Sequence, residues 1–250
     1  MPNAHQSWEV LPHNPIEKLA ENLWRVQGAL PKMALRRVMT IARLGDGRLV
    51  IHSAIALDDA SMQDMEAWGT PAVLIVPNVY HRLDAMPYKK RFPDLCVLCP
   101  EGARKKVEEI LPVDGTYEDF PSDDAVTLSY IDGVAQAEGV MQVRSQDGTT
   151  LVFNDLLFNM PHAKGVAGFI FRYLTQSTGG PRFSRIVRWF VIKDKAAARA
   201  AIERLADTPD LVRIVVSHHR MITDDPAGVL RQAASRLSCR VATRPPLAFL

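Results

Sequence analysis

The chain has 250 residues, of which 47% are hydrophobic and 23% charged, a composition typical of an ordinary soluble globular protein with one large domain. Its net charge is only +2, so the total charge indicates no nucleic-acid partner. The N-terminus lacks the basic and apolar regions of a signal peptide, and no apolar run approaches the roughly 18 residues of a membrane span. We therefore expect a cytoplasmic protein without a membrane span.

Three cysteines, an odd number, argue against a disulfide framework and fit a reducing compartment. Cys96 and Cys99 have the C-x-x-C spacing of a redox pair or of half a zinc site. They belong to a short apolar run that we interpret as a strand, in which residues i and i+3 point to opposite faces. We therefore interpret both as buried structural cysteines.

The first residues of the chain, 1–22, are expected to form an extended lead-in, because prolines interrupt any regular structure. Residues 23–250 then form a single domain. Its first elements are two strands, over 37–43 and 49–55, and the Gly-Asp-Gly turn between them favours a hairpin.

Helices and strands then alternate along the chain, as the spacing of apolar residues indicates. Ser61 with Asp64 is a candidate cap for the first helix. The expected helices are 61–68, a turn at 86–91, 103–110, 193–205 and 227–237, and the expected strands are 73–76, 96–98, 126–131, 140–145 and 151–153.

The segment 161–190 is expected to be a helical insertion in which arginines alternate with aromatic residues. The arginines are Arg172, Arg182, Arg185 and Arg188. One interpretation is a lid or a membrane-surface helix, whose arginines meet phosphate or carboxylate groups. The interpretation that we favour is two packed helices whose apolar faces join the core while the arginines remain in water.

A cluster of polar residues follows the apolar run 73–76, which is bounded by prolines and is too short for a helix. We interpret the run as a buried strand. In open α/β folds the loop that leaves the carboxyl end of such a strand is the usual place for chemistry. Asn78, Tyr80, His81 and Asp84 are therefore the first candidate site residues.

Four motifs, in chain order, resemble the metallo-β-lactamase fold. They are the hairpin over 37–55, the strand and loop over 73–84, the strand over 150–158 with Asp155, and the run 213–219 that ends in His218 and His219. The resemblance covers residues from Leu23 to about Leu237, and it implies an αββα sandwich, a four-layer α/β fold. It also implies that Asp155 corresponds to the family's metal-bridging aspartate and that the last run carries its final ligand histidine.

The loop of the second motif departs from the family's H-x-H-x-D-H metal-binding sequence. In alignment, Asn78, Tyr80, Arg82 and Leu83 stand at the ligand positions. The middle histidine of the family is also absent, since 127–143 contains no histidine. The resemblance is therefore to a divergent bacterial branch of the fold, and we expect no dinuclear zinc site.

A reduced metal site remains if His81, Asp155 and one of the adjacent His218 and His219 converge. Two imidazoles and a carboxylate can bind a single Zn²⁺, Fe²⁺ or Mn²⁺ and leave positions open to water. The chain would then be a hydrolase in which metal-activated water attacks an ester, thioester, lactone or phosphate.

Tyr80 and Arg82 are further candidate catalytic residues, because each has a donor that can stabilise a developing oxyanion. Arg82 is alternatively the anchor for a small anionic molecule, a carboxylate or phosphate, or it forms a surface salt bridge with Asp84 or another surface acid. Asp155 could instead cap a helix, and a lone loop histidine such as His81 is more often structural.

The sequence leaves two functions open, from different classes. One is a metallo-β-lactamase-fold hydrolase with a reduced, mononuclear metal centre. The alternative is a non-catalytic ligand-binding or protein-interaction module that retains only the scaffold, because fold alone does not determine function. A homo-oligomer is compatible with both. His52 and His162 have no evident partners in the sequence, and we interpret them as structural.

Overall fold

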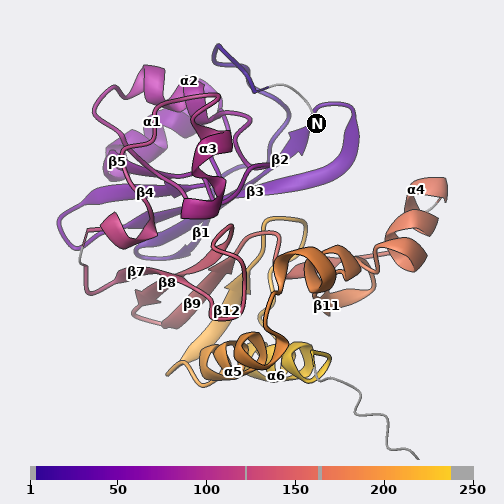
Figure 1. The fold of residues 1–250 in the computed structure, drawn as a ribbon. Helices are drawn as coiled ribbons and strands as arrows, with labels where there is room; N and C mark the ends of the chain where they lie inside the picture. Colours follow the sequence, from indigo (N-terminus) through magenta and orange to yellow (C-terminus); the bar gives the residue numbers. More distant parts are fainter. Residues whose placement is uncertain (1–3, 122, 163–164, 238–250) are drawn as a thin grey trace, which may run out of the picture.

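The computed structural model describes residues 4–121, 123–162 and 165–237, which form two stacked β-sheets with helices on both outer surfaces (Figure 1). The layers follow the order helix, sheet, sheet, helix. This is the αββα sandwich expected from the sequence, so the predicted fold class is confirmed.

The first sheet has six strands in the order β1 to β6. They are β1 (Glu17–Ala20), β2 (Leu23–Leu30), β3 (Met33–Arg43), β4 (Arg48–His52), β5 (Thr70–Ile75) and β6 (Cys96–Leu98). The strands from β1 to β4 pair antiparallel, whereas β4, β5 and β6 are parallel. Parallel neighbours need a crossover connection, and α1 (Asp59–Trp68) and α2 (Ala85–Arg91) supply the two, with α3 (Arg104–Val107) after β6.

Local sequence explains how two of these elements begin. Gly47, in the turn between β3 and β4, has φ 89°, a left-handed conformation that glycine adopts without strain. Helix α1 begins at Asp59 because the side chain of Asp58 accepts a hydrogen bond from the backbone N of Ser61 at 2.8 Å. The predicted cap, Ser61 with Asp64, is therefore wrong.

The second sheet has four strands in the order β12–β9–β8–β7. They are β7 (Val126–Tyr130), β8 (Gly139–Ser145), β9 (Gly148–Phe153) and β12 (Leu211–Val215). The strands β7, β8 and β9 are antiparallel, and β12 is parallel to β9. Helices α5 (Lys195–Ala206) and α6 (Pro226–Ser235) cover the outer face of this sheet (Figure 1).

Buried apolar side chains fill three layers. The middle layer, between the sheets, includes Val50, Ile75, Met141 and Val152. One outer layer packs the first sheet against α1, α2 and α3, and the other packs the second sheet against α5 and α6. Because alternate residues of a strand point to opposite faces, each sheet contributes side chains to two of the three layers.

Between β10 (Phe158–Met160) and α5 the chain leaves the sandwich as a projection, residues 165–191, that we call the arm (Figure 1). The arm contains α4 (Gly165–Phe169), the π-helical turn Ile170–Leu174, strand β11 (Gly180–Arg182), which pairs with β10, and the π-helical turn Val187–Val191. Phe183 and Val187 join the core, but the larger aromatic side chains of the arm are exposed. Our favoured interpretation, two helices with apolar faces in the core, is therefore wrong for most of the arm. None of the described helices is long and apolar enough to cross a membrane.

The C-x-x-C cysteines lie at β6. Cys99 is buried and Cys96 is half-buried, and both are free thiols. Burial raises the pKa of the Cys99 thiol to about 12, so at neutral pH the thiolate needed for metal binding or redox chemistry is scarce. The third cysteine, Cys239, lies outside the described residues.

Candidate functional site

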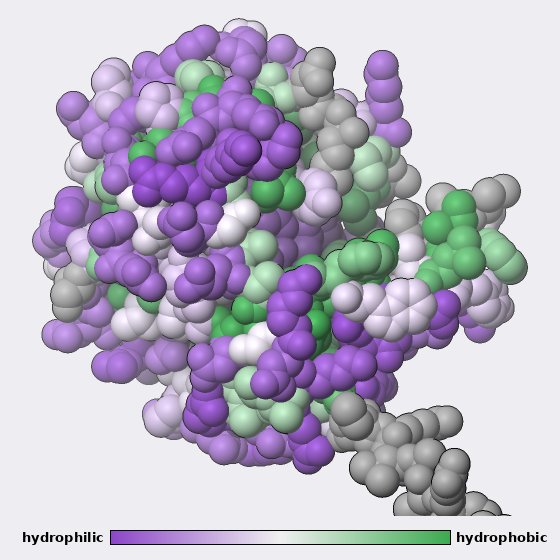
Figure 2. Space-filling model, viewed as in Figure 1, coloured by the Kyte–Doolittle hydropathy of each residue, from purple (hydrophilic) through white to green (hydrophobic). Residues whose placement is uncertain are grey.

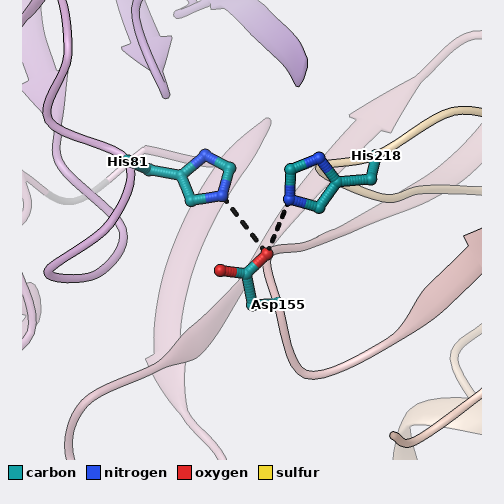
Figure 3. A group of neighbouring side chains, drawn as sticks. All are labelled: His81, Asp155 and His218. Atoms are coloured by element: carbon teal, nitrogen blue, oxygen red, sulfur yellow. Dashed lines mark hydrogen bonds and ion pairs between the residues drawn. The ribbon is translucent and has the colours of Figure 1, made fainter. Parts of the chain in front are cut away.

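Three side chains converge at the ends of three strands: His81 after β5, Asp155 after β9 and His218 after β12 (Figure 3). Their ligand atoms all lie within 4.8 Å of one another. The carboxyl ends of β9 and β12 meet because these strands are parallel neighbours, and the loop after β5 reaches them from the first sheet. A backbone hydrogen bond of 2.9 Å from Val38 in β3 to Ser217 joins the two sheets beside the cluster.

The structure distinguishes between the two adjacent histidines. His218 is buried and belongs to the cluster, whereas His219 does not. His219 has φ 65°, a left-handed conformation that is uncommon for a residue with a side chain, and its carbonyl accepts a hydrogen bond from Gln27. Of the two sequence candidates, His218 is therefore the one that faces Asp155.

One oxygen of Asp155 faces both imidazoles (Figure 3). Oδ1 lies 3.2 Å from Nε2 of His81 and 3.1 Å from Nε2 of His218. The opposite ring nitrogens are held by the first sheet: Nδ1 of His81 lies 2.8 Å from the Ser53 hydroxyl, and Nδ1 of His218 lies 2.7 Å from the Arg36 carbonyl oxygen. Partners of this kind fix the ring orientation of histidines that bind metals.

The hydrogen bond between His218 and Arg36 also fixes the tautomer of His218. A carbonyl oxygen only accepts, so Nδ1 must carry the hydrogen. In the neutral ring Nε2 then presents a lone pair to Asp155 Oδ1, which is itself an acceptor when ionised. Two lone pairs that face each other at 3.1 Å repel, so a cation, either a proton or a metal ion, must lie between them. His81 has no such constraint, because a hydroxyl such as that of Ser53 can donate or accept.

The charges of the cluster reinforce one another. Burial disfavours the ionised form of Asp155, but the neighbouring His81 and His218 outweigh burial and hold the pKa of this carboxyl well below its ordinary value. Burial likewise disfavours the charged form of His218, but the hydrogen bond and charge of Asp155 outweigh it and raise the pKa of His218. The site is thus built around an ionised carboxylate.

Asn78 connects the loop after β5 to this carboxylate. Its Nδ2 donates to Oδ2 of Asp155 at 2.8 Å and to Oε1 of Glu138 at 2.7 Å. Its Oδ1 accepts from the backbone N of Tyr80 at 2.8 Å and of His81 at 3.1 Å. Asn78 therefore fastens the loop that carries His81, although it stands at a position where the family has a metal ligand.

Glu138 and Ser53 are site residues that the sequence analysis missed. Glu138 is buried directly before β8, and burial together with the nearby Asp155 raises its pKa to about 8. Its Oε2 has no hydrogen-bond partner among the described residues. The sequence signal for Glu138 is an isolated carboxylate next to a strand, in a region that contains no histidine. Ser53 follows β4, the parallel neighbour of β5, and that adjacency was its signal.

Tyr80 and Arg82 line the wall of the cleft above the cluster. The side chain of Tyr80 is exposed and Arg82 donates a hydrogen bond to the carbonyl oxygen of Lys106. Arg82 also lies 3.8 Å from Glu109, a long ion pair at the surface. Both residues are thus placed beside the cluster, and neither contacts Asp155 directly.

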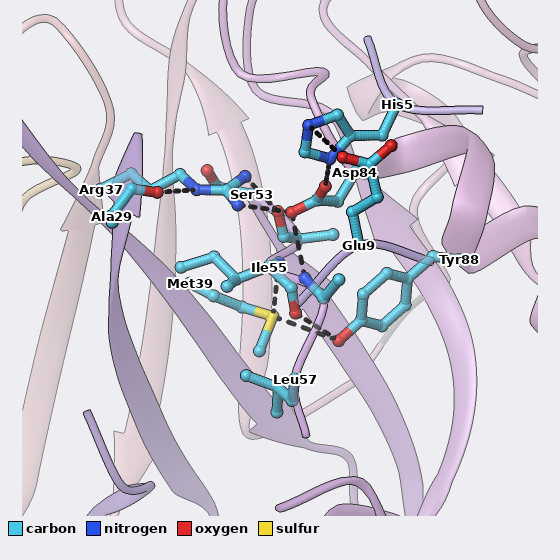
Figure 4. A network of polar contacts seen from close by, with 12 residues as sticks. His5, Glu9, Ala29, Arg37, Met39, Ser53, Ile55, Leu57, Asp84 and Tyr88 are labelled. Atoms are coloured by element: carbon cyan, nitrogen blue, oxygen red, sulfur yellow. Dashed lines mark hydrogen bonds and ion pairs between the residues drawn. The ribbon is translucent and has the colours of Figure 1, made fainter. Parts of the chain in front are cut away.

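Asp84 does not open toward the site as expected. It is fully buried, and its carboxylate is shared by His5 at 2.7 Å, Arg37 at 2.5 Å and the backbone N of Ala56 at 3.0 Å (Figure 4). Of the alternative that Arg82 pairs with Asp84 or another surface acid, the first partner is wrong, because Arg37 occupies that carboxylate, and the second is confirmed by the ion pair with Glu109. Asp84 lies at the start of α2 and faces inward, where it pairs with the buried Arg37, a contact that no sequence pattern indicates.

The cleft beside the cluster has a volume of about 720 Å³. Apolar side chains form much of its wall: Leu30, Met33, Leu35, Val79 and Ile110. Its cationic lining is Arg37, Arg82 and Lys106, and Asp155 is the single acidic residue among the described residues that line it. Apart from the His81–Asp155–His218 cluster, this cleft suits a ligand with an apolar part and with an anionic part near Arg82 and Lys106, which share Glu109.

The remaining histidines lie outside the cluster. His52 is buried, and burial with the nearby His81 lowers its pKa to about 3, so it is neutral at ordinary pH. His162 lies 3.1 Å from the Thr178 hydroxyl. Neither belongs to a group of side chains placed to bind a metal, within the part of the chain that the structure describes.

Three solved structures that resemble this one are metallo-β-lactamases. The DIM-1 metallo-β-lactamase, in a crystal structure after exposure to ceftazidime, has a TM-score of 0.61 at 12% identity, covering 92% of this chain and 100% of that chain. The enzyme from Pontibacter korlensis has a TM-score of 0.55 at 12% identity, covering 88% and 98%. The enzyme from Hirschia baltica has a TM-score of 0.57 at 14% identity, covering 90% and 98%.

Comparisons of sequence alone find less. No protein-family model matches the chain, and none of the curated proteins matches it significantly. At such low identity the structural likeness establishes the path of the chain and not its chemistry. The chain has the metallo-β-lactamase fold.

Proposed function

We propose that the protein is a hydrolase with a reduced, mononuclear metal centre, whose protein ligands are His81, Asp155 and His218. The observation that carries this proposal is the contact between Nε2 of His218 and Oδ1 of Asp155, where two acceptors face each other at 3.1 Å. A divalent cation at their common point would satisfy both atoms, and Nε2 of His81 points to the same place.

The donor set fits one metal ion. Two imidazole nitrogens and one carboxylate oxygen suit Zn²⁺, Fe²⁺ or Mn²⁺, and the cleft leaves the remaining coordination positions accessible. The set does not fit two ions, because the family's other ligand positions hold Asn78, Tyr80, Arg82 and Leu83. Asn78 cannot replace a metal ligand, because its amide nitrogen already donates to two carboxylates. Arg82 cannot replace one either, because its guanidinium stays charged and has no lone pair for a cation.

When bound, such an ion lowers the pKa of a coordinated water and polarises a carbonyl or phosphoryl oxygen. The residues of this chain supply the surrounding functions. Ser53 and the Arg36 carbonyl hold the two rings, and Asn78 holds the second oxygen of Asp155. Tyr80 and Arg82 stand on the cleft wall, where their donors can meet a developing oxyanion.

The lining of the cleft suggests the kind of substrate. Its apolar wall would accept the acyl or alkyl part of an ester, thioester or lactone, and its basic side chains would accept a carboxylate or phosphate. We propose a substrate that combines the two.

Metal content tests the proposal directly. Protein purified without chelators or a metal-affinity tag is expected to carry about one equivalent of Zn, Fe or Mn per chain by elemental analysis. Asp155→Ala and His218→Ala should each lower metal affinity at least about tenfold. His219→Ala is the matched control, because it removes the adjacent imidazole that does not belong to the cluster.

Two outcomes contradict the proposal. One is a wild-type protein that takes up none of the three metals when each is supplied. The other is two equivalents of zinc per chain that are lost together in Asp155→Ala, which would show a dinuclear site.

Activity is the second test. A panel of nitrophenyl esters and phosphates, a thioester and a lactone is assayed with the metal-loaded protein. Arg82→Gln and Tyr80→Phe are expected to lower kcat by about 10²-fold if their donors stabilise the oxyanion. An unchanged kcat in both variants would remove these residues from the catalytic set.

The second candidate function is a non-catalytic module that binds a small anionic molecule. The basic lining of the cleft favours it, as does the alternative that a proton, instead of a metal ion, lies between His218 and Asp155. A thermal-shift screen of carboxylate and phosphate metabolites compares wild type with Arg82→Ala. This function is supported by a ligand that raises the Tm of wild type more than that of the variant, and it is contradicted if no ligand does so.

A further inference from the structure

The arm carries a large exposed apolar surface (Figure 2). Its exposed apolar side chains are Phe169 (59%), Ile170 (39%), Tyr173 (52%), Leu174 (57%), Ile186 (52%), Trp189 (65%) and Phe190 (67%). Single exposed apolar residues are ordinary, but seven on one short projection indicate an interaction site. The arm projects from the sandwich, so the group is accessible from several directions (Figure 1).

The charge of the same stretch is one-sided. Residues 156–193 contain no Asp or Glu, although at the chain-wide frequency of 28 acidic residues in 250 a stretch of this length would hold about four. Its basic residues are Lys164, Arg172, Arg182, Arg185, Arg188 and Lys193. The arm is therefore cationic as well as apolar, and its partner should be anionic.

The arginines of the arm are not neutralised by the protein. The guanidinium of Arg172 lies over the ring of Tyr173 at 5.3 Å, and that of Arg185 lies over Trp189 at 5.5 Å. Neither forms an ion pair with any described residue. Arg188 donates to the neutral amide oxygen of Gln176 at 2.8 Å. Each charge thus stands beside an aromatic or neutral group and is free to meet an external anion.

We propose that the arm docks on the surface of an anionic lipid bilayer, with its aromatic side chains in the headgroup region and its arginines on the lipid phosphates. Exposed Trp, Phe and Tyr interleaved with Arg on short helical segments suit that environment, since the rings enter the interface while the guanidinium groups remain at the phosphates. A second copy of the chain is a poor partner for the arm, because the two surfaces in contact would both be cationic.

The root of the arm lies beside the candidate site. The ring of Phe158 in β10 stacks on His218 with centroids 6.1 Å apart, and Asn159 donates to the carbonyl oxygen of Arg220 at 2.9 Å. Docking of the arm would therefore hold the molecule with this edge toward the bilayer. The inference itself rests on the arm alone and stands whether or not a metal binds.

Vesicle co-sedimentation tests the proposal. The whole protein is mixed with phosphatidylcholine vesicles, with and without about 30% phosphatidylglycerol, at low and high salt. We expect binding to the vesicles that contain phosphatidylglycerol only, and loss of that binding when NaCl rises from about 50 to 500 mM. A blue shift of tryptophan fluorescence that disappears in Trp189→Phe would place this ring in the interface.

Two paired variants separate the apolar and the charged contributions. Trp189→Ala/Phe190→Ala and Arg172→Gln/Arg185→Gln should each lower partitioning at least about tenfold, since one arginine at an anionic surface contributes about fivefold. The matched controls are Val10→Ala/Met33→Ala, which removes exposed apolar groups elsewhere, and Arg48→Gln/Arg104→Gln, which removes two charges from the other half. The controls should bind as wild type, and circular dichroism checks that every variant is folded.

Three results overturn the proposal: no binding of wild type to the anionic vesicles, equal binding to both kinds of vesicle, or binding that the arm variants leave unchanged. A dimer in solution that Trp189→Ala/Phe190→Ala dissociates, with no vesicle binding by wild type, would assign the arm to a second copy instead.

Discussion

Two carboxylates of this fold, the fully buried Asp84 and the half-buried Asp155, are held in opposite ways. Both oxygens of Asp84 are met by hydrogen-bond donors, Arg37, His5 and a backbone N–H, and no part of the residue reaches solvent (Figure 4). Asp155 has one oxygen held by Asn78 and one facing two imidazoles, and it lines the cleft (Figure 3).

The difference distinguishes a structural charge from a functional one. A sealed carboxylate with a guanidinium and a backbone N–H is electrostatically complete, and it has nothing left to offer a ligand. A carboxylate whose second oxygen faces ring nitrogens of ambiguous protonation is incomplete until a cation arrives. The exposure of the two side chains and the count of donors and acceptors around each carboxylate point to the same distinction.

The largest expected effect is a loss of stability when the buried Asp84 loses its charged partner. Arg37→Ala leaves Asp84 buried without its charged partner and should lower the free energy of unfolding by about 3–5 kcal/mol. Asp155→Ala, in metal-free protein, removes the attraction to His81 and His218 together with the repulsion from Glu138, and should cost less, about 1–3 kcal/mol. Urea unfolding at neutral pH measures both, and equal losses would abolish the distinction.

A second prediction concerns Glu138, the buried carboxyl group that lies beside Asp155. The pKa of Glu138 is raised to about 8 from an ordinary value of 4.5, so between these values the native protein holds a proton that the unfolded chain has released. The free energy of unfolding should therefore fall as pH rises from about 5 to 8, and Glu138→Gln should flatten that slope and stabilise the metal-free protein at pH 8 by on the order of 2–4 kcal/mol.

Chemical denaturation of the metal-free protein at several pH values measures this slope. Glu118→Gln, a change at an exposed position, is the control and should keep the wild-type slope. A Glu138→Gln variant that is less stable than wild type at pH 8 would mean that the carboxylate is ionised and held by partners.

The smallest effect sharpens the functional side of the comparison. Ser53→Ala removes the hydroxyl that holds Nδ1 of His81, without touching a proposed ligand atom. Metal affinity should fall by about 10- to 100-fold, which competition against a chelator measures. Ser61→Ala, on α1, is the control. Affinity unchanged by Ser53→Ala would show that the His81 ring needs no support from the first sheet.

The strands β3 to β9 and β12 were readable from the sequence, because short apolar runs between prolines, glycines and polar turns have few other interpretations. Strands β1 and β2, over residues 17–30, were missed, and β1 lies in the segment expected to lack regular structure. Asp155 and the pair His218 and His219 could be named for the same reason, since they follow such runs, but the sequence did not distinguish between the two histidines. Glu138 and Ser53 could not be predicted, because their role depends on contacts in the folded protein. Glu138 accepts a hydrogen bond from Asn78, and the hydroxyl of Ser53 contacts Nδ1 of His81. No periodicity in the sequence records either contact.

The arm and Asp84 also show that the sequence does not indicate which side chains are buried. The aromatic residues of the arm were expected in the core but are exposed, and Asp84 was expected in an open loop but is buried. An aromatic segment is ordinarily assigned to the core, and the exposure of Trp189 and Phe190 depends on the absence of a partner element that sequence pattern does not reveal. Asp84 follows a polar loop and was grouped with it, yet one residue further along the chain α2 begins and the side chain turns inward. Local polarity indicates a loop, but not the direction in which each side chain points.

The hydrogen bond from Val38 to Ser217 and the contact of His218 with the Arg36 carbonyl have a consequence for assembly. Asp155 and His218 are carried by one half of the chain, but the groups that orient the rings come from β3 and β4 of the other half. The cluster therefore spans the contact between the two sheets. Neither half can preform it, and a sliding of one sheet over the other would separate the His218 ring from the Arg36 carbonyl oxygen that orients it and would disturb the middle core layer.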